Sequence, residues 1–154
     1  MTDPLLISIN NLAVTEGGRD RFLLEAARTI QRFYPQYNWV GFYFLEDDGK
    51  LHVGPYVGKE TPHTVIELDR GICGAAVTGG ETVIVDDVNS DPRYLACSLE
   101  TRSEIVIPLR LKSKIIGELD IDSAQPAAFS EENQRRLEAV VGIIEKRLGG
   151  LIRD

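Results

Sequence analysis

The amino-acid sequence predicts an α+β domain in which helices cover one face of an antiparallel sheet. A 3.6-residue apolar period marks a helix towards each end of the chain. Between these helices, two pairs of β-rich runs are each joined by a short polar turn, which is typical of antiparallel hairpins. The length of 154 residues suits one domain, and we expect residues 1–154 to form a single unit.

The first helix is expected over residues 20–34, because its apolar side chains form one face and Pro35 ends the pattern. The next segment, NWVGFYFLEDDGKLHVGPYVG (38–58), holds two runs rich in aromatic and β-branched residues. Between them, Asp48 and Gly49 form a pair that strongly favours a hairpin turn.

The middle of the chain predicts shorter elements. We expect strands over residues 64–68 and 82–85, with a short helix over 71–78 between them that begins at a glycine. Residues 86–103 then form a long polar connection. Such loops are uncommon in compact domains and are often functional when present, although a plain connector is the alternative.

The last third of the chain predicts a second hairpin and a final helix. Residues 104–122 are typical of two strands joined by a turn near 111–113. The helix is expected from about Glu131 to Leu148, with Ser130 as its N-cap.

One face of the predicted sheet gathers aromatic and acidic side chains. Side chains alternate between the two faces of a strand, so those of the first and last strands meet if the helices cover the opposite face. Neighbouring acids repel one another unless a cation lies among them, and a ligand ammonium group would be such a cation. An acidic strand face in solvent is the alternative. The members of this face are Trp39, Tyr43, Glu104, Glu118, Asp120 and Asp122.

The chain has two cysteines, in different settings. Cys73 lies at the start of the predicted helix 71–78, where free N–H groups and the helix dipole lower the pKa of a thiol. For an isolated cysteine, however, we expect a small buried side chain at Cys73, and activation is the alternative. Cys97 lies in the polar connection with Arg93 and Arg102 near it in sequence, which favours exposure and a lowered pKa. The spacing of the cysteines and histidines indicates no metal site.

The charge of the protein excludes several classes of partner. A formal net charge of −7 disfavours binding to nucleic acid or to anionic membranes. The sequence has no apolar run long enough to span a membrane, and its N-terminus lacks the features of a signal peptide. We therefore expect a cytoplasmic protein.

Six short motifs are more specific. They are WVGFYF (39–44), Gly-Pro at 54–55, GICG (71–74), Asp-Val at 87–88, ACSLETRSEIVIP (96–108) and IIGELDIDS (115–123). Together they resemble the free methionine-R-sulfoxide reductases, a family of single GAF domains. The resemblance covers about residues 20–148, and it is far narrower than a resemblance to GAF domains at large, most of which are small-molecule sensors.

The resemblance implies a reaction and the residues that perform it. Members of the family reduce free L-methionine-(R)-S-oxide, not the peptide-bound residue, and require no flavin, metal or nucleotide. Cys97 matches the nucleophile, and Cys73 matches a second cysteine that can convert the Cys97 sulfenic acid into a disulfide. Thioredoxin or a similar dithiol would reduce that disulfide. The carboxyl groups would donate a proton to the sulfoxide oxygen and bind the substrate ammonium. The positions that match the substrate pocket are Trp39, Tyr43, Glu104, Asp120 and Asp122.

One position departs from the family pattern. Many members carry a third cysteine ten residues before the cysteine of the GxCG motif, and this chain has His63 there. Recycling would then depend on Cys73, or on an external thiol that reduces Cys97 directly. We expect His63 at the surface, with a role as a proton shuttle as the alternative.

Other functions stay open at this stage. A non-catalytic GAF module would bind a small ligand without turnover, and a redox sensor would use a disulfide between Cys73 and Cys97 to change a partner contact. The apolar stripe of the last helix is expected to support a homodimer, unless the protein's own sheet covers the stripe.

Overall fold

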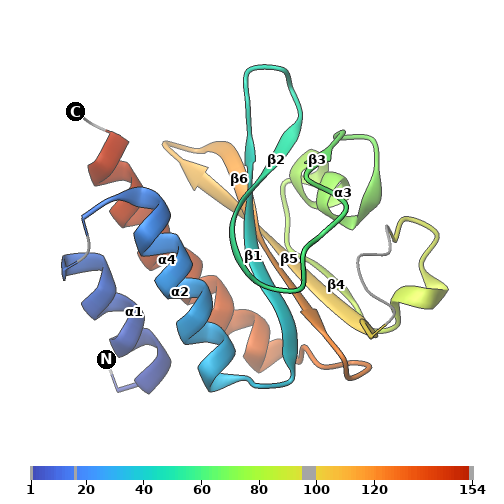
Figure 1. The fold of residues 1–154 in the computed structure, drawn as a ribbon, viewed down its shortest axis with the longest axis horizontal. Coiled ribbons are helices and arrows are strands. Elements are labelled where there is room, and N and C mark those ends of the chain that lie inside the picture. Colours follow the sequence, from blue (N-terminus) through green and yellow to red (C-terminus); the bar gives the residue numbers. More distant parts are fainter. Residues whose placement is uncertain (1, 16, 95–99, 153–154) are drawn as a thin grey trace.

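The computed structural model describes residues 2–15, 17–94 and 100–152. It confirms the α+β fold, with a six-stranded antiparallel sheet in the order β3-β2-β1-β6-β5-β4 (Figure 1). The strands are β1 (Tyr37–Leu45), β2 (Leu51–Gly58), β3 (Val65–Ile66), β4 (Val83–Val85), β5 (Ser103–Leu111) and β6 (Lys114–Ser123). The helices are α1 (Pro4–Thr15), α2 (Arg19–Phe33), α3 (Gly71–Gly79) and α4 (Glu131–Ile152), with a 3-10 turn η1 (Val88–Ser90).

The ends of the long helices follow from local sequence. The backbone N–H of Tyr34 closes α2 on the carbonyl of Ile30, just before Pro35. At the start of α4, the Ser130 hydroxyl oxygen accepts a hydrogen bond from the Asn133 N–H at 3.1 Å, which confirms the predicted N-cap.

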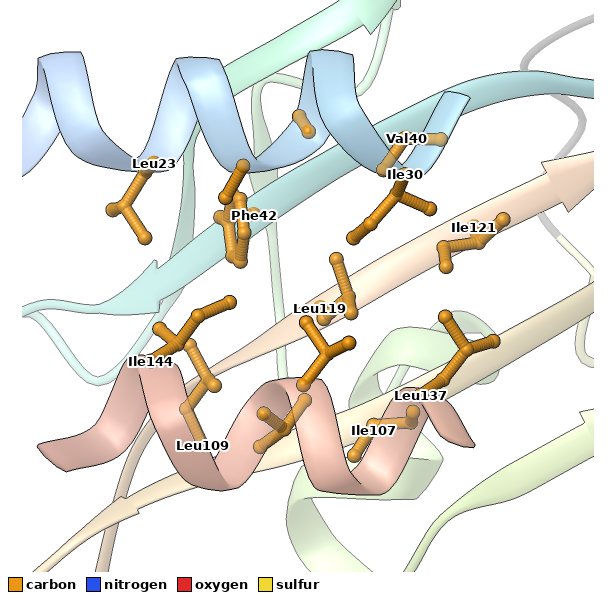
Figure 2. Close-up of a cluster of buried hydrophobic side chains, with 14 of the residues drawn as sticks. Leu23, Ile30, Val40, Phe42, Ile107, Leu109, Leu119, Ile121, Leu137 and Ile144 are labelled. Carbon is orange, nitrogen blue, oxygen red and sulfur yellow. The ribbon is translucent and has the colours of Figure 1, made fainter. Parts of the chain in front are cut away.

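The main hydrophobic core lies between the sheet and the pair α2 and α4. Figure 2 shows side chains of both helices pointing at side chains of the strands between them. On the sheet, Phe42 of β1 and Leu119 of β6 are fully buried there. The apolar stripe of α4, including Ile144, is buried on the same core. The stripe is thus covered by the protein's own sheet, which removes the reason for a dimer that the sequence offered.

The N-terminal helix α1 is an element that the sequence analysis missed. Its side chains Leu5 and Ile9 are fully buried in the main core. An ion pair between Asp3 and Arg136, with 2.7 Å between oxygen and nitrogen, joins its start to α4. Leu5, Ile9 and Leu12 follow the spacing of one helix face, so the sequence contains a signal for α1 that was not used in the sequence analysis.

The opposite face of the sheet carries α3, which packs against β5 and β6 (Figure 1). A second hydrophobic cluster lies on this face and includes Trp39, Tyr43, Cys73 and Val106. Gly71 begins α3 with a φ of 72°, a backbone conformation that favours glycine. The short helix was predicted correctly, while the strand predicted over 64–68 is only two residues long.

In the described ranges, no helix combines the length and the apolar character that crossing a membrane requires.

Candidate functional site

The predicted aromatic and acidic face exists, and it is buried. In the register of β1 and β6, Trp39 pairs with Asp122 and Tyr43 pairs with Glu118. On the other side of β6, Glu104 of β5 also pairs with Asp122. None of the six predicted members of this face is more than 5% exposed, so the alternative of an acidic face in solvent is wrong.

Trp39 and Tyr43 form the aromatic end of the face. Their ring centroids are 6.0 Å apart, and both polar groups are satisfied by backbone carbonyls. The Trp39 indole N–H donates to the Lys59 oxygen at 3.2 Å, and the Tyr43 hydroxyl donates to the His63 oxygen at 2.9 Å. The two rings are therefore held in fixed positions on this face of the sheet.

Gly41, between these aromatic residues, leaves room for the Trp39 ring. A Cβ at Gly41 would lie 2.4 Å from the Tyr56 Cβ and 2.6 Å from the Trp39 ring. Any larger residue would have to displace one of these side chains.

At the acidic end, Asp122 has a polar partner that sequence reasoning did not identify. The Thr101 hydroxyl donates to Asp122 at 3.5 Å, and the Asn38 side-chain amide donates to Thr101 at 3.2 Å. Thr101 belongs to the polar connection before β5, where the sequence has no periodicity that would indicate a buried position.

Cys73 occupies the centre of the face. It is the third residue of α3 and is 6% exposed. Its thiol donates a hydrogen bond to an Asp120 oxygen at 3.4 Å. The Cys73 sulfur and one carboxyl oxygen each from Glu104 and Asp120 lie within 4.8 Å of one another. A group this compact can also hold a cation, so the absence of a metal stays a prediction.

The structure agrees with the expectation of a buried thiol at Cys73 and not with an activated one. Burial, followed by the nearby charges of Asp120, Glu118 and Glu104, raises the pKa of Cys73 well above its usual value. A helix dipole contributes at most about 1 kcal/mol at an ordinary site, which is less than the cost of burying an anion among carboxylates. Cys73 is thus a buried thiol, as expected for an isolated cysteine, and it has a carboxyl partner.

Burial also changes the carboxyl groups. It raises the pKa of Asp122 and of Glu118 well above their usual values, and the charge of Asp120 adds to the effect in both. The pKa of Asp120 is raised by burial too, although hydrogen bonds from Glu104 and Cys73 oppose the rise. Carboxyl groups that keep their protons near neutral pH are suited to act as general acids.

A cavity of about 20 Å³ reaches this cluster. Such a volume holds roughly one water molecule, whereas pockets for whole ligands are usually several hundred Å³. The cavity could therefore hold a single reacting group, but it is too small for a whole amino acid. His63 borders it and is half-buried, which corrects the expectation of a surface residue. The lining residues are Tyr43, His63, Ile66, Gly71, Ile72, Cys73, Glu104 and Asp120.

The predicted nucleophile Cys97 lies in the segment 95–99, outside the described residues. The described residues on either side of that segment both contact the site face. Tyr94 packs against the second hydrophobic cluster, and Thr101 holds Asp122.

Comparisons with known proteins identify the family of the chain. A family model for the GAF domain matches residues 18–146. The free methionine-R-sulfoxide reductase of Escherichia coli (strain K12) is 40% identical over 134 residues, which cover 85% of this chain and 80% of that protein. The chain belongs to the free methionine-R-sulfoxide reductase family of GAF domains.

Solved structures of the same family have the same fold. An X-ray structure of free methionine-R-sulfoxide reductase from Neisseria meningitidis in complex with its substrate has a TM-score of 0.88 and 35% identity, with 93% of this chain and 85% of that chain covered. The reduced form of fRMsr of Staphylococcus aureus has a TM-score of 0.87 and 36% identity, with coverage of 94% and 92%. Membership confirms the resemblance and the expectation of an oxidoreductase.

Proposed function

We propose that this protein reduces free L-methionine-(R)-S-oxide to methionine, with Cys97 as the nucleophile and Cys73 as the resolving cysteine. The observation that carries the proposal is the buried cluster of carboxyl groups around the Cys73 thiol. Family membership favours this substrate, because the relatives from Escherichia coli and Saccharomyces cerevisiae are free methionine-R-sulfoxide reductases. In the first step, the thiol of Cys97 and the sulfoxide give methionine and a Cys97 sulfenic acid, so the oxygen passes from one sulfur to the other.

The buried acids supply what this step requires. The sulfoxide oxygen needs a proton as the bond between sulfur and oxygen weakens, and a neutral Asp120 or Asp122 can donate one. Glu104 lies between them and interacts with both. The remaining carboxylate would bind the substrate ammonium, a charge that peptide-bound methionine lacks. Trp39 and Tyr43 would enclose the S-methyl end.

In the second step, Cys73 would attack the Cys97 sulfenic acid. A disulfide forms and one water molecule leaves, with the Cys73 proton accepted by Asp120 and a proton returned to the departing hydroxide. Cys97 is three residues from Tyr94, so a fully extended chain would place it within roughly 11 Å of that residue. This reach allows Cys97 to approach the face that holds Cys73. A thioredoxin-type dithiol, in the reducing cytoplasm expected from the sequence, would complete the cycle.

The first experiment is an assay of methionine formed from the free R-sulfoxide by the purified protein, with dithiothreitol as reductant. We expect turnover by the wild type and its loss in Cys97→Ser, because the nucleophile is gone. We expect Cys73→Ser to turn over with dithiothreitol and to fail with thioredoxin, because a protein dithiol needs a disulfide to attack.

The outcomes separate this proposal from the sensor. A wild type that binds the sulfoxide but forms no methionine with either reductant would favour a non-catalytic GAF module. Peptide-bound methionine sulfoxide is the matched control substrate, and its reduction at a similar rate would contradict the role of the carboxylates in ammonium binding.

A further inference from the structure

Thr101 connects three parts of the fold beside the site, and the proposed mechanism gives it no role. It lies just before β5 and is 2% exposed. Its hydroxyl oxygen accepts a hydrogen bond from the Asn38 side-chain amide of β1 at 3.2 Å. Its hydroxyl group donates to Oδ2 of Asp122 on β6 at 3.5 Å. Asn38, Thr101 and Asp122 therefore form a buried hydrogen-bond relay.

The direction of this relay follows from the groups that form it. An amide N–H only donates, and a hydroxyl group has one hydrogen, so Thr101 accepts from Asn38 and gives its hydrogen to Asp122. Oδ1 of Asp122 is buried and has no hydrogen-bond partner in the described ranges. A proton on Oδ2 would leave the Thr101 hydrogen without an acceptor in that part of the chain, so the proton of a neutral Asp122 lies on Oδ1.

The groups around Asp122 hold this proton until the reaction. Burial, followed by the charge of Asp120, raises the pKa of Asp122 well above its usual value. Hydrogen bonds from Glu104 and Thr101 oppose the rise. Glu104 faces Asp122 from β5, and the cross-strand partner on β1 is the uncharged Trp39. Once the proton has left, the Thr101 hydroxyl stabilises the carboxylate, because a hydrogen bond to a charged group is stronger than one to a neutral group.

We propose that Asn38 and Thr101 are positioning residues that make Asp122 the proton donor of the reaction: they hold its Oδ2 and leave the proton on Oδ1 for the sulfoxide oxygen. The other candidate, Asp120, is engaged by the Cys73 thiol at 3.4 Å. This inference rests on the proposed function and assigns one of its steps.

The step balances in atoms and electrons. Asp122 gives its proton to the sulfoxide oxygen while the Cys97 sulfur takes that oxygen, so the substrate sulfur is reduced and the Cys97 sulfur is oxidised. The proton that leaves the Cys97 thiol restores the neutral Asp122. The products are methionine and a Cys97 sulfenic acid, as in the overall reaction.

Steady-state kinetics with the free R-sulfoxide and dithiothreitol test this assignment. Thr101→Val removes the hydroxyl group and keeps the shape of the side chain, whereas Thr101→Ser keeps the hydroxyl group. We expect Thr101→Val to lower kcat about tenfold with little change in KM, because the proton moves only in the transition state. Thr101→Ser should retain most of the wild-type kcat, and equal kcat values in the two variants would overturn the proposal. The control is Thr82→Val, which removes a hydroxyl donor to Glu138 of α4 outside the site and should leave kcat unchanged.

The pH dependence of kcat separates this role from a loss of packing. An acid must be protonated to react, so kcat falls as pH rises through the pKa of the donor. Loss of the Thr101 hydrogen bond raises the pKa of Asp122 further, so we expect the alkaline limb to move up by about one pH unit in Thr101→Val. Asn38→Ala, at a half-buried position, should move the limb the same way but less. A limb that stays in place or moves down in Thr101→Val would contradict the role.

Urea unfolding tests the contact without turnover. We expect Thr101→Val to lower the free energy of unfolding less in an Asp122→Ala background than in the wild type, because the acceptor is already gone. Additive losses would show that the two side chains do not interact, and the inference would fail. If the wild type forms no methionine but the losses are not additive, the proposed function fails and the hydrogen bond stands. If methionine forms and the two Thr101 variants have equal kcat, the inference fails and the function stands.

Discussion

At the scale of single residues, the site face gathers acids whose pKa values are raised by burial in the folded chain. Glu118 and Asp122 lie in the sheet with raised pKa values, whereas in the unfolded chain they ionise near their ordinary values. The native state then binds more protons than the unfolded state at neutral pH. Such groups lower the free energy of unfolding as pH rises. The same raised pKa values make them suitable proton donors beside the Cys73 thiol.

The effect of a buried acid on the free energy of unfolding can be measured at Glu118. Above a pH of about 4.3, the unfolded chain loses the Glu118 proton while the native state keeps it, so the free energy of unfolding falls by up to about 1.4 kcal/mol per pH unit from this group. Glu118→Met removes this pH dependence, and it also removes a buried carboxyl group whose oxygens have no hydrogen-bond partner in the described residues. We expect the variant to be more stable than the wild type by about 1–3 kcal/mol at neutral pH, with the difference shrinking towards pH 4.

Urea unfolding over this pH range checks the prediction. The matched control is Glu132→Met, at an exposed position in the first turn of α4, where no comparable gain is expected. A stability difference that grows as pH falls would mean that Glu118 is ionised in the native state.

Gly41 permits a second prediction at this scale. Gly41→Ala places a Cβ against the Tyr56 side chain and the Trp39 ring, and the ring would have to move. We expect KM for the free sulfoxide to rise by about tenfold or more, because small displacements of positioning groups are costly. Gly142→Ala on α4 meets no atom within 4 Å and is the control. An unchanged KM in Gly41→Ala would exclude Trp39 from the substrate site.

At the scale of elements, sequence patterns predicted most of the sheet. The Asp-Gly turn and the alternation along β6 set the two hairpins and the face that each side chain occupies. The helix α1 was overlooked in the sequence, although its buried residues Leu5 and Ile9 are four positions apart, as on one face of a helix. The patterns did not predict the raised pKa of Cys73, because the start of a helix is visible in the sequence while the carboxyl groups that surround it come from β5 and β6.

The contribution of α1 can be measured directly. Leu5 is fully buried against the core, and Ile7 on the same helix is 40% exposed. We expect Leu5→Ala to lower the free energy of unfolding by about 2–5 kcal/mol, because it removes buried methyl groups and leaves a cavity. Ile7→Ala should cost much less in the same urea titration. Equal losses in the two variants would contradict the packing of α1 on α4.

At the scale of the whole molecule, the sheet separates two functions. The main core with α2 and α4 lies on one side, and the acids, the aromatic rings and α3 lie on the other (Figure 1). The first and last described elements, α1 and α4, both lie on the helical side, away from α3 (Figure 1). Assembly through the helices would therefore leave the site face uncovered.

The homodimer stays a prediction, and sedimentation velocity tests it. The chain has a mass of 17.1 kDa, and a dimer would sediment with twice that mass. If the dimer forms at micromolar concentrations, we expect activity per subunit to be independent of dilution, because the described residues of the site face lie together within one chain. A single sedimenting species with the monomer mass of 17.1 kDa would contradict the homodimer.

The alternation of acids with aliphatic residues along β6 has one more consequence, for folding. β6 lies in the interior of the sheet, between β1 and β5, so its pairing decides the position of every neighbouring strand. A slip of one residue would bring Glu118, Asp120 and Asp122 under α2 and α4 and expel Leu119 and Ile121 from the core. No such misaligned sheet could compete with the native one. The buried carboxyl groups of β6 thereby also act against strand misalignment while the chain folds.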